Sequence, residues 1–247
     1  MNSKFTDSQI KNWENFCRHL GDWHGIWSVY DLKGELVNSF KCTRSFHLSE
    51  DKTEINHQNY TVYSDGKTKD QVFGPYKQPH KISLHLEDCF SLGSTEVKPD
   101  NDFSFEIGFK YQERRRSGVA RYNKDGTINI LVISEHLGHF VNESPFNRLN
   151  NFDNWEGSLI KMTPDLVVLD KVKTSWYELD TLSRDNIILH LNDGISISLP
   201  SQVETNKDFC VAVEWLVTPT LLYRGIRHFS SNFSGYTSAI FSYNAEK

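Results

Sequence analysis

Two histidines, His136 and His139, have the spacing of a metal-binding pair. Such a pair holds a metal when it lies on a helix or a tight turn with a third ligand nearby. Here the pair stands where an expected strand ends, and no glutamate or cysteine is placed to complete a ligand set. We therefore predict no metal at this pair and interpret both residues as surface or hydrogen-bonding histidines.

Three consecutive arginines, Arg114 to Arg116, follow a strand expected over residues 103–111. Side chains alternate along extended backbone, so Arg115 points away from Arg114 and Arg116. An inward arginine in a barrel can hold a ligand carboxylate through two hydrogen bonds. The alternative interpretation is a charged hairpin turn that protects an exposed sheet edge.

Motifs for covalent catalysis are missing from the sequence. No serine stands in a Gly-x-Ser-x-Gly sequence, no glycine-rich phosphate loop is present, and the adjacent acids Glu87 and Asp88 fall in an irregular stretch. We assign no catalytic residue on this basis.

Composition excludes several classes of protein. The 247 residues are 38% hydrophobic and carry a formal net charge of -5, which gives no electrostatic footprint for nucleic acid. The sequence shows no signal peptide and no membrane-spanning stretch, so we expect a cytoplasmic protein. Its four cysteines form no Cys-x-x-Cys pair and are interpreted as reduced packing residues.

One helix is expected, over residues 6–20. Thr6 can cap it together with Gln9, and the apolar residues recur at helical spacing before Gly21 ends it. This stripe needs an apolar partner, which is either the open end of a barrel or the outer face of a sheet.

From Asp22 onward the sequence alternates with a period of two between turn signals such as Asp65-Gly66 and Asp125-Gly126. In residues 103–111 every odd position is apolar or aromatic and every even position is small or charged. This pattern predicts an all-β fold of antiparallel strands, either a β-sandwich or an up-and-down β-barrel.

The first strand, over residues 21–30, is unusually rich in tryptophan. Alternation places Trp23, Gly25, Trp27 and Val29 on one face of it. We expect Trp23 to close one end of the barrel beneath the helix.

The chain also shows signs of an internal duplication. Residues 138–154 form a polar connector, after which Trp155-Glu156-Gly157 repeats Trp23-His24-Gly25. Residues 118–122 likewise resemble residues 225–229. We predict two halves, residues 1–140 and 141–247, which form either two small barrels or one wider one.

A pattern of tryptophans carries a family resemblance. Gly21-x-Trp23 at the start of the first strand, after a short helix and before an antiparallel meander with a basic residue on a late strand, resembles the calycin superfamily of lipocalins, fatty-acid-binding proteins and nitrobindins. The longer sequence Trp-x-x-Phe-x-x-x-x-Gly-x-Trp-x-Gly-x-Trp over residues 13–27 resembles a group of uncharacterised lipocalin-like proteins of photosynthetic organisms. The resemblance implies that Trp23 packs against Arg121, and Trp155 against Arg227. The chain lacks the longer glycine-rich first strand and the late histidine of nitrobindins, so haem is not expected.

Aromatic residues are abundant and suit a cavity for a flat or long apolar ligand, although they could equally fill a packed core. We predict a non-enzymatic protein that binds a hydrophobic molecule such as a fatty acid, pigment or tetrapyrrole. One alternative is a bilin lyase or isomerase on the same barrel with a protein acceptor, using His136, His85 or Tyr122; another is a ligand-free interaction scaffold. The expected ligand-binding residues are Trp27, Phe105, Phe109, Arg116, Arg121, Tyr122 and His136, and the expected barrel-closing residues are Trp23, Gly25, Trp155 and Arg227.

Overall fold

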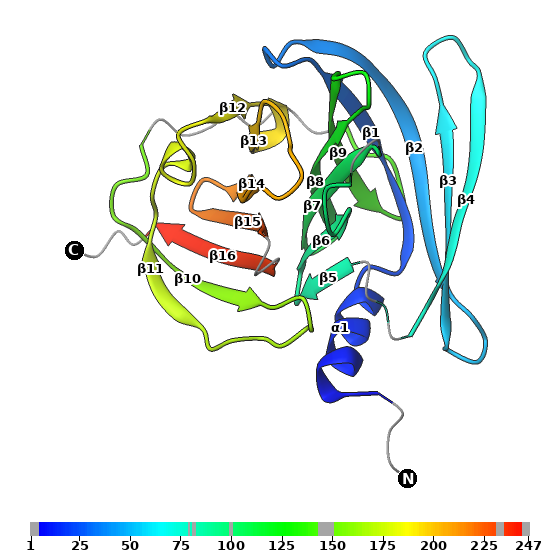
Figure 1. Ribbon diagram of the computed structural model, residues 1–247. Coiled ribbons are helices and arrows are strands. Elements are labelled where there is room, and N and C mark those ends of the chain that lie inside the picture. Colours follow the sequence, from blue (N-terminus) through cyan, green and yellow to red (C-terminus); the bar gives the residue numbers. More distant parts are fainter. Residues whose placement is uncertain are drawn as a thin grey trace.

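The protein is an all-β molecule with one α-helix at its N-terminus, which confirms the expected fold class. The computed structural model describes residues 5–78, 80, 83–98, 101–142, 151–230 and 235–243. Two strongly curled antiparallel sheets lie side by side, with the helix below the first of them (Figure 1). No helix in these described ranges has the length and apolar character needed to cross a membrane.

The first sheet has nine strands in the order β4-β3-β2-β1-β9-β8-β7-β6-β5. It is a meander in which the last strand returns to pair with the first, and only β4 and β5 are not hydrogen-bonded to each other. The strands are β1 (Gly21–Tyr30), β2 (Leu36–Leu48), β3 (Glu54–Val62), β4 (Thr68–Lys77), β5 (Ser83–Leu86), β6 (Cys89–Gly93), β7 (Phe103–Tyr111), β8 (Arg114–Tyr122) and β9 (Ile128–Leu137).

The second sheet has seven strands in the order β11-β10-β16-β15-β14-β13-β12. Its first and last strands also pair, and the break again falls between two consecutive strands, β11 and β12. The strands are β10 (Trp155–Met162), β11 (Val172–Ser175), β12 (Asn186–His190), β13 (Ile195–Pro200), β14 (Phe209–Thr218), β15 (Leu221–Phe229) and β16 (Gly235–Tyr243), with short 3₁₀ turns η1 (Leu179–Thr181) and η2 (Asn192–Gly194) between them.

The shared wiring of the two sheets supports the duplication. Gly25 on β1 lies so close to β9 that a Cβ atom there would stand 2.0 Å from the backbone oxygen of Ser134. Gly157 on β10 approaches β16 in the same way, with the backbone oxygen of Ile240 at 2.4 Å from such an atom. Each half therefore needs glycine two residues after the first tryptophan of its first strand, because that strand crosses the last strand closely at this point.

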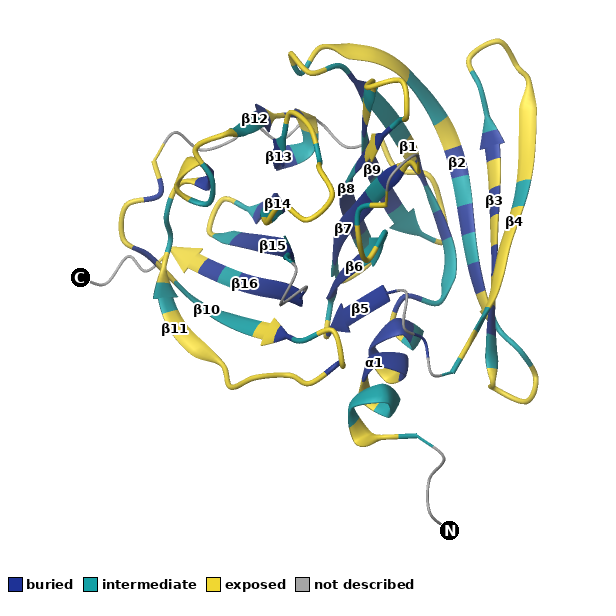
Figure 2. Ribbon diagram, in the orientation of Figure 1, coloured by how far each residue is buried: buried dark blue, intermediate teal, exposed yellow. Residues whose placement is uncertain are grey.

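The two sheets pack back to back through one hydrophobic core. Phe105 and Ile107 of the first sheet join Val213 and Trp215 of the second in a single buried cluster. Figure 2 shows the resulting distribution: buried strands gather where the sheets meet, whereas β4 at the outer edge is mostly exposed. Of the two predicted architectures, the structure thus shows two curled sheets and not one wide barrel.

The helix α1 (Asp7–Cys17) begins with the predicted capping box. The Gln9 backbone N–H donates to the Thr6 hydroxyl, and the Thr6 backbone N–H donates to the Gln9 side chain. Two buried asparagines, which the apolar stripe did not predict, fix the helix to the unpaired edge of β5: the Asn12 amide donates to the carbonyls of His80 and Ser83, each at 3.1 Å. The Asn15 amide donates to the carbonyl of His85. The helix therefore satisfies backbone groups that the missing β4–β5 pairing leaves free.

The interpretation of Arg114 to Arg116 as a hairpin turn is wrong. The turn consists of Gln112 and Glu113, and Gln112 adopts a positive φ of 56°. All three arginines belong to β8, so they alternate between its two faces. Part of the predicted connector, residues 143–150, lies outside the described residues.

Candidate functional site

A cavity of about 260 Å³ lies on the concave side of the first sheet. We call this cavity the lumen. Side chains from every strand of this sheet and from the end of α1 surround it, and six of them are aromatic. The lining residues are Phe16, His19, Trp27, Arg44, Phe46, His57, Asn59, Phe73, Tyr76, His80, Ser83, His85, Phe90, Leu92, Glu106, Arg115, Val119, Leu131 and Ile133.

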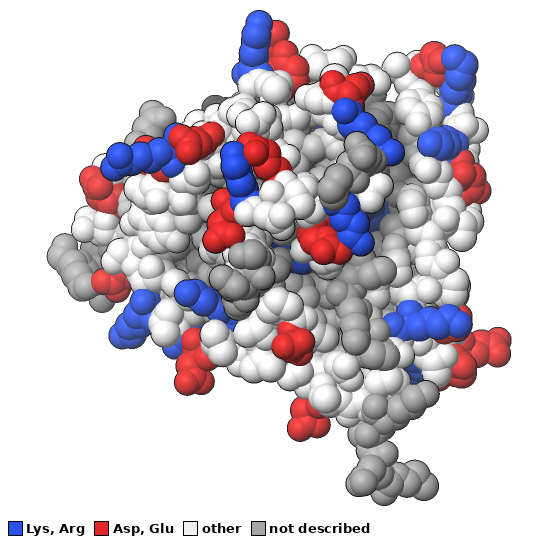
Figure 3. Space-filling view, in the orientation of Figure 1, with Lys and Arg blue, Asp and Glu red and all other residues white. Residues whose placement is uncertain are grey.

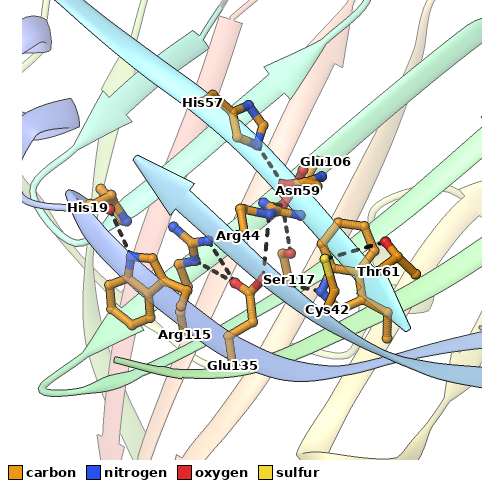
Figure 4. A network of polar contacts seen from close by, with 12 residues as sticks. His19, Cys42, Arg44, His57, Asn59, Thr61, Glu106, Arg115, Ser117 and Glu135 are labelled. Atoms are coloured by element: carbon orange, nitrogen blue, oxygen red, sulfur yellow. Dashed lines mark hydrogen bonds and ion pairs between the residues drawn. The ribbon is translucent and has the colours of Figure 1, made fainter. Parts of the chain in front are cut away.

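A buried network of ion pairs crosses one wall of the lumen (Figure 4). At its centre is Glu135 on β9, whose side chain is fully buried. Arg115 on β8 donates to this carboxylate from Nε at 2.8 Å and lies within 2.7 Å through Nη2. The Trp27 indole N–H also donates to it, at 3.2 Å, and Arg44 on β2 lies 3.4 Å away. One carboxylate thus joins four neighbouring strands, β2, β1, β9 and β8.

Glu106 on β7 extends the network. Arg44 donates to it at 3.1 Å and the Ser117 hydroxyl at 2.8 Å. Burial alone would raise the pKa of Glu106, but Arg44, Ser117 and Arg115 together outweigh burial and lower it. Burial would lower the pKa of Arg44, but the carboxylates of Glu106 and Glu135 outweigh burial and raise it. Glu106 and Arg44 are therefore both charged and compensate each other.

Four buried histidines line the rest of the cavity. Burial lowers the pKa of His57 to about 3 and that of His80 to about 4. Burial also lowers the pKa of His19 and His85 well below the usual value, and His85 and Arg115 are among the neighbours that lower His19 further. All four imidazoles are consequently neutral at pH 7.

These histidines differ in their hydrogen bonds. His57 is bonded on both ring nitrogens, to the Tyr76 hydroxyl at 2.9 Å and to the Asn59 amide oxygen at 2.8 Å. His85 is bonded through Nε2 to the Ser83 hydroxyl at 2.8 Å. Its Nδ1, and both ring nitrogens of His19, have no hydrogen-bond partner among the described residues.

Trp23 lies on the same face of β1 as Trp27 but packs against α1 and does not line the cavity. It is fully buried in a cluster with Trp13 and Phe16 of α1, and its indole N–H donates to the carbonyl of His19 at 2.8 Å. The arginine over its ring is Arg115, at 4.6 Å from the ring centre.

The resemblance assigned this role to Arg121, and the assignment is wrong. Arg121 lies on the same face of β8 as Arg115 but six residues further along, roughly 20 Å away at about 3.3 Å per residue. There it is exposed and pairs with Asp102.

Phe105 and Phe109, predicted to line the cavity, point the other way. Both are buried in the core between the sheets, together with the apolar residues of β13 to β15. The even positions of β7 face the lumen, and Glu106 is one of them. The sequence pattern correctly separated the apolar face of this strand from its polar face, but the lumen lies on the polar face.

Arg116, Tyr122 and His136 also lie outside the lumen. Arg116 points toward the second sheet, where its guanidinium lies 5.8 Å from the Trp215 ring centre. Tyr122 donates from its hydroxyl to the Pro200 carbonyl at 2.8 Å. His136 lines a separate groove of about 200 Å³ with Arg116 and Asp193, on the opposite face of β1 and β9. Of the predicted ligand-binding residues, Trp27 lines the cavity.

The second half differs from the first in that its own chain covers the corresponding face. Trp176 donates to Glu214 at 3.3 Å, Arg224 donates to the same carboxylate and to the Tyr177 carbonyl, and Leu179 packs on Ala212. Trp155 packs with Phe152 and Phe241 in a cluster that Trp176 also contacts.

The pairing of Trp155 with Arg227 is wrong, because Arg227 and Arg224 lie on opposite faces of β15. Arg227 faces the first sheet and donates to the Ser91 hydroxyl at 3.3 Å. The arginine over the aromatic rings of the second half is Arg224, at 5.2 Å from the Phe241 ring centre.

Two further findings bear on the choice of site. A larger groove of about 370 Å³ lies between loops near Asn123 and Gln202, but its lining is mainly polar loop residues and it holds no buried charge network. In the part of the chain that the structure describes, no cluster of three or more histidine, cysteine or acidic side chains has the arrangement to hold a metal. The four cysteines are unpaired.

Comparison with known families identifies the first half. Residues 9–140 match the N-terminal domain of a family described as a domain of unknown function, DUF3598. The chain belongs to the DUF3598 family. Residues 163–241 of this DUF3598 protein match a second model, described as the C-terminal domain of biogenesis factor required for ATP synthase 1. None of the curated proteins matches the chain.

Among solved structures, a DUF3598-family protein of unknown function from Nostoc punctiforme shares the fold. It is 19% identical, with 94% of this chain and 99% of that chain covered and a TM-score of 0.77. An S-type phycobiliprotein lyase from Guillardia theta is 10% identical over 98% of this chain and 100% of that one, with a TM-score of 0.23. A putative outer membrane protein from Bacteroides fragilis is 11% identical over 96% and 100%, with a TM-score of 0.29. The last two values are too low to carry an argument.

Proposed function

We propose that this DUF3598 protein binds a small apolar, aromatic molecule in the lumen of its first half, without acting on it chemically. The observation that carries the proposal is the cavity itself: a space lined by aromatic rings, in a molecule whose other half is filled by its own chain. Apolar walls with a few fixed polar groups are the usual composition of small-molecule sites. The resemblance to calycins agrees with this assignment.

The volume of the cavity indicates the size of the ligand. A cavity of about 150 Å³ holds one benzene molecule, so 260 Å³ accommodates roughly two fused rings. Four pyrrole rings exceed this volume, so a tetrapyrrole would have to extend out of the open side of the lumen. Among the hydrophobic ligands considered from the sequence, a compact aromatic compound is therefore favoured over a tetrapyrrole or a long fatty acid.

The alternative of a bilin lyase would take its acid or base from His136, His85 or Tyr122. Of these, His85 lines the lumen, whereas His136 and Tyr122 lie on other faces. His85 is therefore the one of the three that could act on a molecule in the lumen.

A cavity-filling substitution tests the proposal. We expect wild-type protein to bind 2-naphthol saturably with one molecule per chain by calorimetry, and Val119→Trp to weaken this binding by about tenfold or more because the indole occupies the lumen. Val72→Trp, on the exposed face of β4, should leave the affinity unchanged. The proposal fails if wild-type protein binds no 2-naphthol and native mass spectrometry of freshly purified protein detects no apolar molecule.

A second candidate function concerns the second half, which we propose as a docking module for ATP synthase subunits. Two observations favour it: the match of residues 163–241 to a domain of an ATP synthase biogenesis factor, and an exposed apolar run of Val167, Val168, Leu169 and Val172 before and within β11. Scattered exposed apolar residues are normal, but a contiguous run is typical of protein contacts.

Charge introduced into this run separates the two functions. Immobilised wild-type protein should retain ATP synthase subunits, and Val168→Glu with Leu169→Glu should abolish retention while 2-naphthol binding persists. The control, Leu36→Glu with Val37→Glu, changes a comparably exposed pair at the start of β2. Equal retention by all three proteins would refute the docking role.

A further inference from the structure

The charged groups of the lumen offer no free partner to a charged ligand. Arg44 and Arg115 are paired with Glu106 and Glu135 at 3.4 Å or less, and their charges sum to zero. A ligand carboxylate would have to displace a buried glutamate or enter an uncompensated site, and both are costly because buried charges need partners. The expectation that an arginine holds a ligand carboxylate therefore does not suit this cavity.

Outside this ion-paired network, unused hydrogen-bonding capacity in the cavity lies on His19 and His85. Their ring centres are 5.4 Å apart, both residues line the cavity, and both are about 2% exposed. Three of their four ring nitrogens have no partner among the described residues. A neutral imidazole has one N–H donor and one acceptor nitrogen, so His19 offers one of each toward the space.

Both rings of this pair also pack on phenylalanine side chains. The His19 ring meets the edge of Phe90 at 5.1 Å, and the His85 ring stacks on Phe16 at 4.7 Å. Buried polar groups of this kind are normally hydrogen-bonded, so three orphaned nitrogens on one wall indicate a missing partner. A hydroxyl or an amide group, which both donates and accepts, complements them.

We infer that His19 and His85 form the polar end of the lumen, and that the ligand is an uncharged aromatic compound carrying a hydroxyl or amide group at that end. The inference rests on the proposed function and adds the chemical class of the ligand. A site that hydrogen-bonds a substrate hydroxyl discriminates strongly against an analogue lacking it, because its own buried groups are then left unpaired.

Three probes of similar shape test this assignment: 2-naphthol, 2-methylnaphthalene and 2-naphthoate, titrated calorimetrically at pH 7.5. We expect 2-naphthol to bind about tenfold tighter than either of the others, equivalent to one net hydrogen bond to a buried group. His19→Phe should remove this advantage and leave the affinity for 2-methylnaphthalene unchanged. Because His19 makes no side-chain hydrogen bond within the described protein, the substitution breaks none.

Controls separate the inference from the proposed function. His47→Phe changes an exposed histidine outside the cavity and should alter no affinity. The inference is overturned if 2-naphthoate binds tightest, if 2-naphthol and 2-methylnaphthalene bind equally, or if His19→Phe weakens both alike. If none of the three probes binds to wild-type protein, the inference is overturned; if native mass spectrometry of freshly purified protein also detects no apolar molecule, the proposed function has failed as well.

Discussion

Replacing Glu135 with glutamine is expected to lower the free energy of unfolding by about 3–5 kcal/mol, the usual effect of removing one partner from a buried ion pair. The Arg115 guanidinium is 3% exposed and would lose the carboxylate that it contacts through two nitrogens. Arg44 would also lose one of its two negatively charged partners, and the Trp27 indole N–H would lose its charged acceptor. Urea denaturation at pH 7.5 measures the change.

Two further variants show that the loss comes from an uncompensated charge. Combining Glu135→Leu with Arg115→Met removes both charges and should recover much of the lost stability, because an apolar pair of similar volume often replaces a buried ion pair without loss. Glu54→Gln breaks the partly exposed pair with Lys77 and should cost about 1 kcal/mol or less. A single Glu135→Gln variant as stable as the wild type would show that the network contributes little.

Acid is expected to unfold the protein well above pH 4. Each of the four lumen histidines has its pKa lowered by burial, to about 3 for His57 and about 4 for His80, whereas an unfolded histidine titrates near 6.5. The unfolded chain therefore binds more protons below pH 6.5, so the stability present above that pH is lost as the pH falls. With four such groups the slope approaches roughly 5 kcal/mol per pH unit below about pH 5.5.

Unfolding free energies measured by urea denaturation between pH 7.5 and pH 4.5 test this expectation. His19→Phe removes one of the four groups and should reduce the slope by roughly a quarter. Glu106, whose pKa is lowered by Arg44 and Ser117 against the effect of burial, adds to the loss only at lower pH, where an unfolded carboxylate titrates. A stability that stays constant from pH 7 to pH 5 would contradict the neutral state of these histidines.

The sequence predicts the elements of this fold well because their signals are local. The capping box of Thr6 and Gln9 and the alternation across residues 103–111 both depend on neighbours within a few positions. The duplication was visible in short motifs, and the matching strand orders of the two sheets support it.

The lumen was harder to predict because alternation separates two faces without saying which one is concave. The apolar face of β7 seemed the natural lining, yet it packs on the second sheet, and the lumen received Glu106. The partners of Glu106 come from β2 and β8, far apart in sequence. A charged residue in the middle of a strongly alternating strand was the signal that could have indicated a buried polar network.

The histidines of the site show the same limitation. His19, His57, His80 and His85 come from a helix end, two strands and a connection, and no spacing rule unites them. Only the curling of the sheet brings their side chains to one cavity. The face on which each arginine of β8 lies was, in contrast, available from the sequence. Once β8 is known to begin at Arg114, Arg115 is the arginine that shares a face with Arg121, and its guanidinium is the one that lies over Trp23.

The single core between the sheets makes the two halves obligate partners. Because Phe105, Ile107, Val213 and Trp215 belong to one cluster, neither sheet can melt without baring the apolar back of the other. Thermal unfolding should consequently be one cooperative transition, and a half cut out at the boundary near residue 140 should aggregate. The boundary near residue 140 therefore does not mark a unit that could be exchanged or inherited alone.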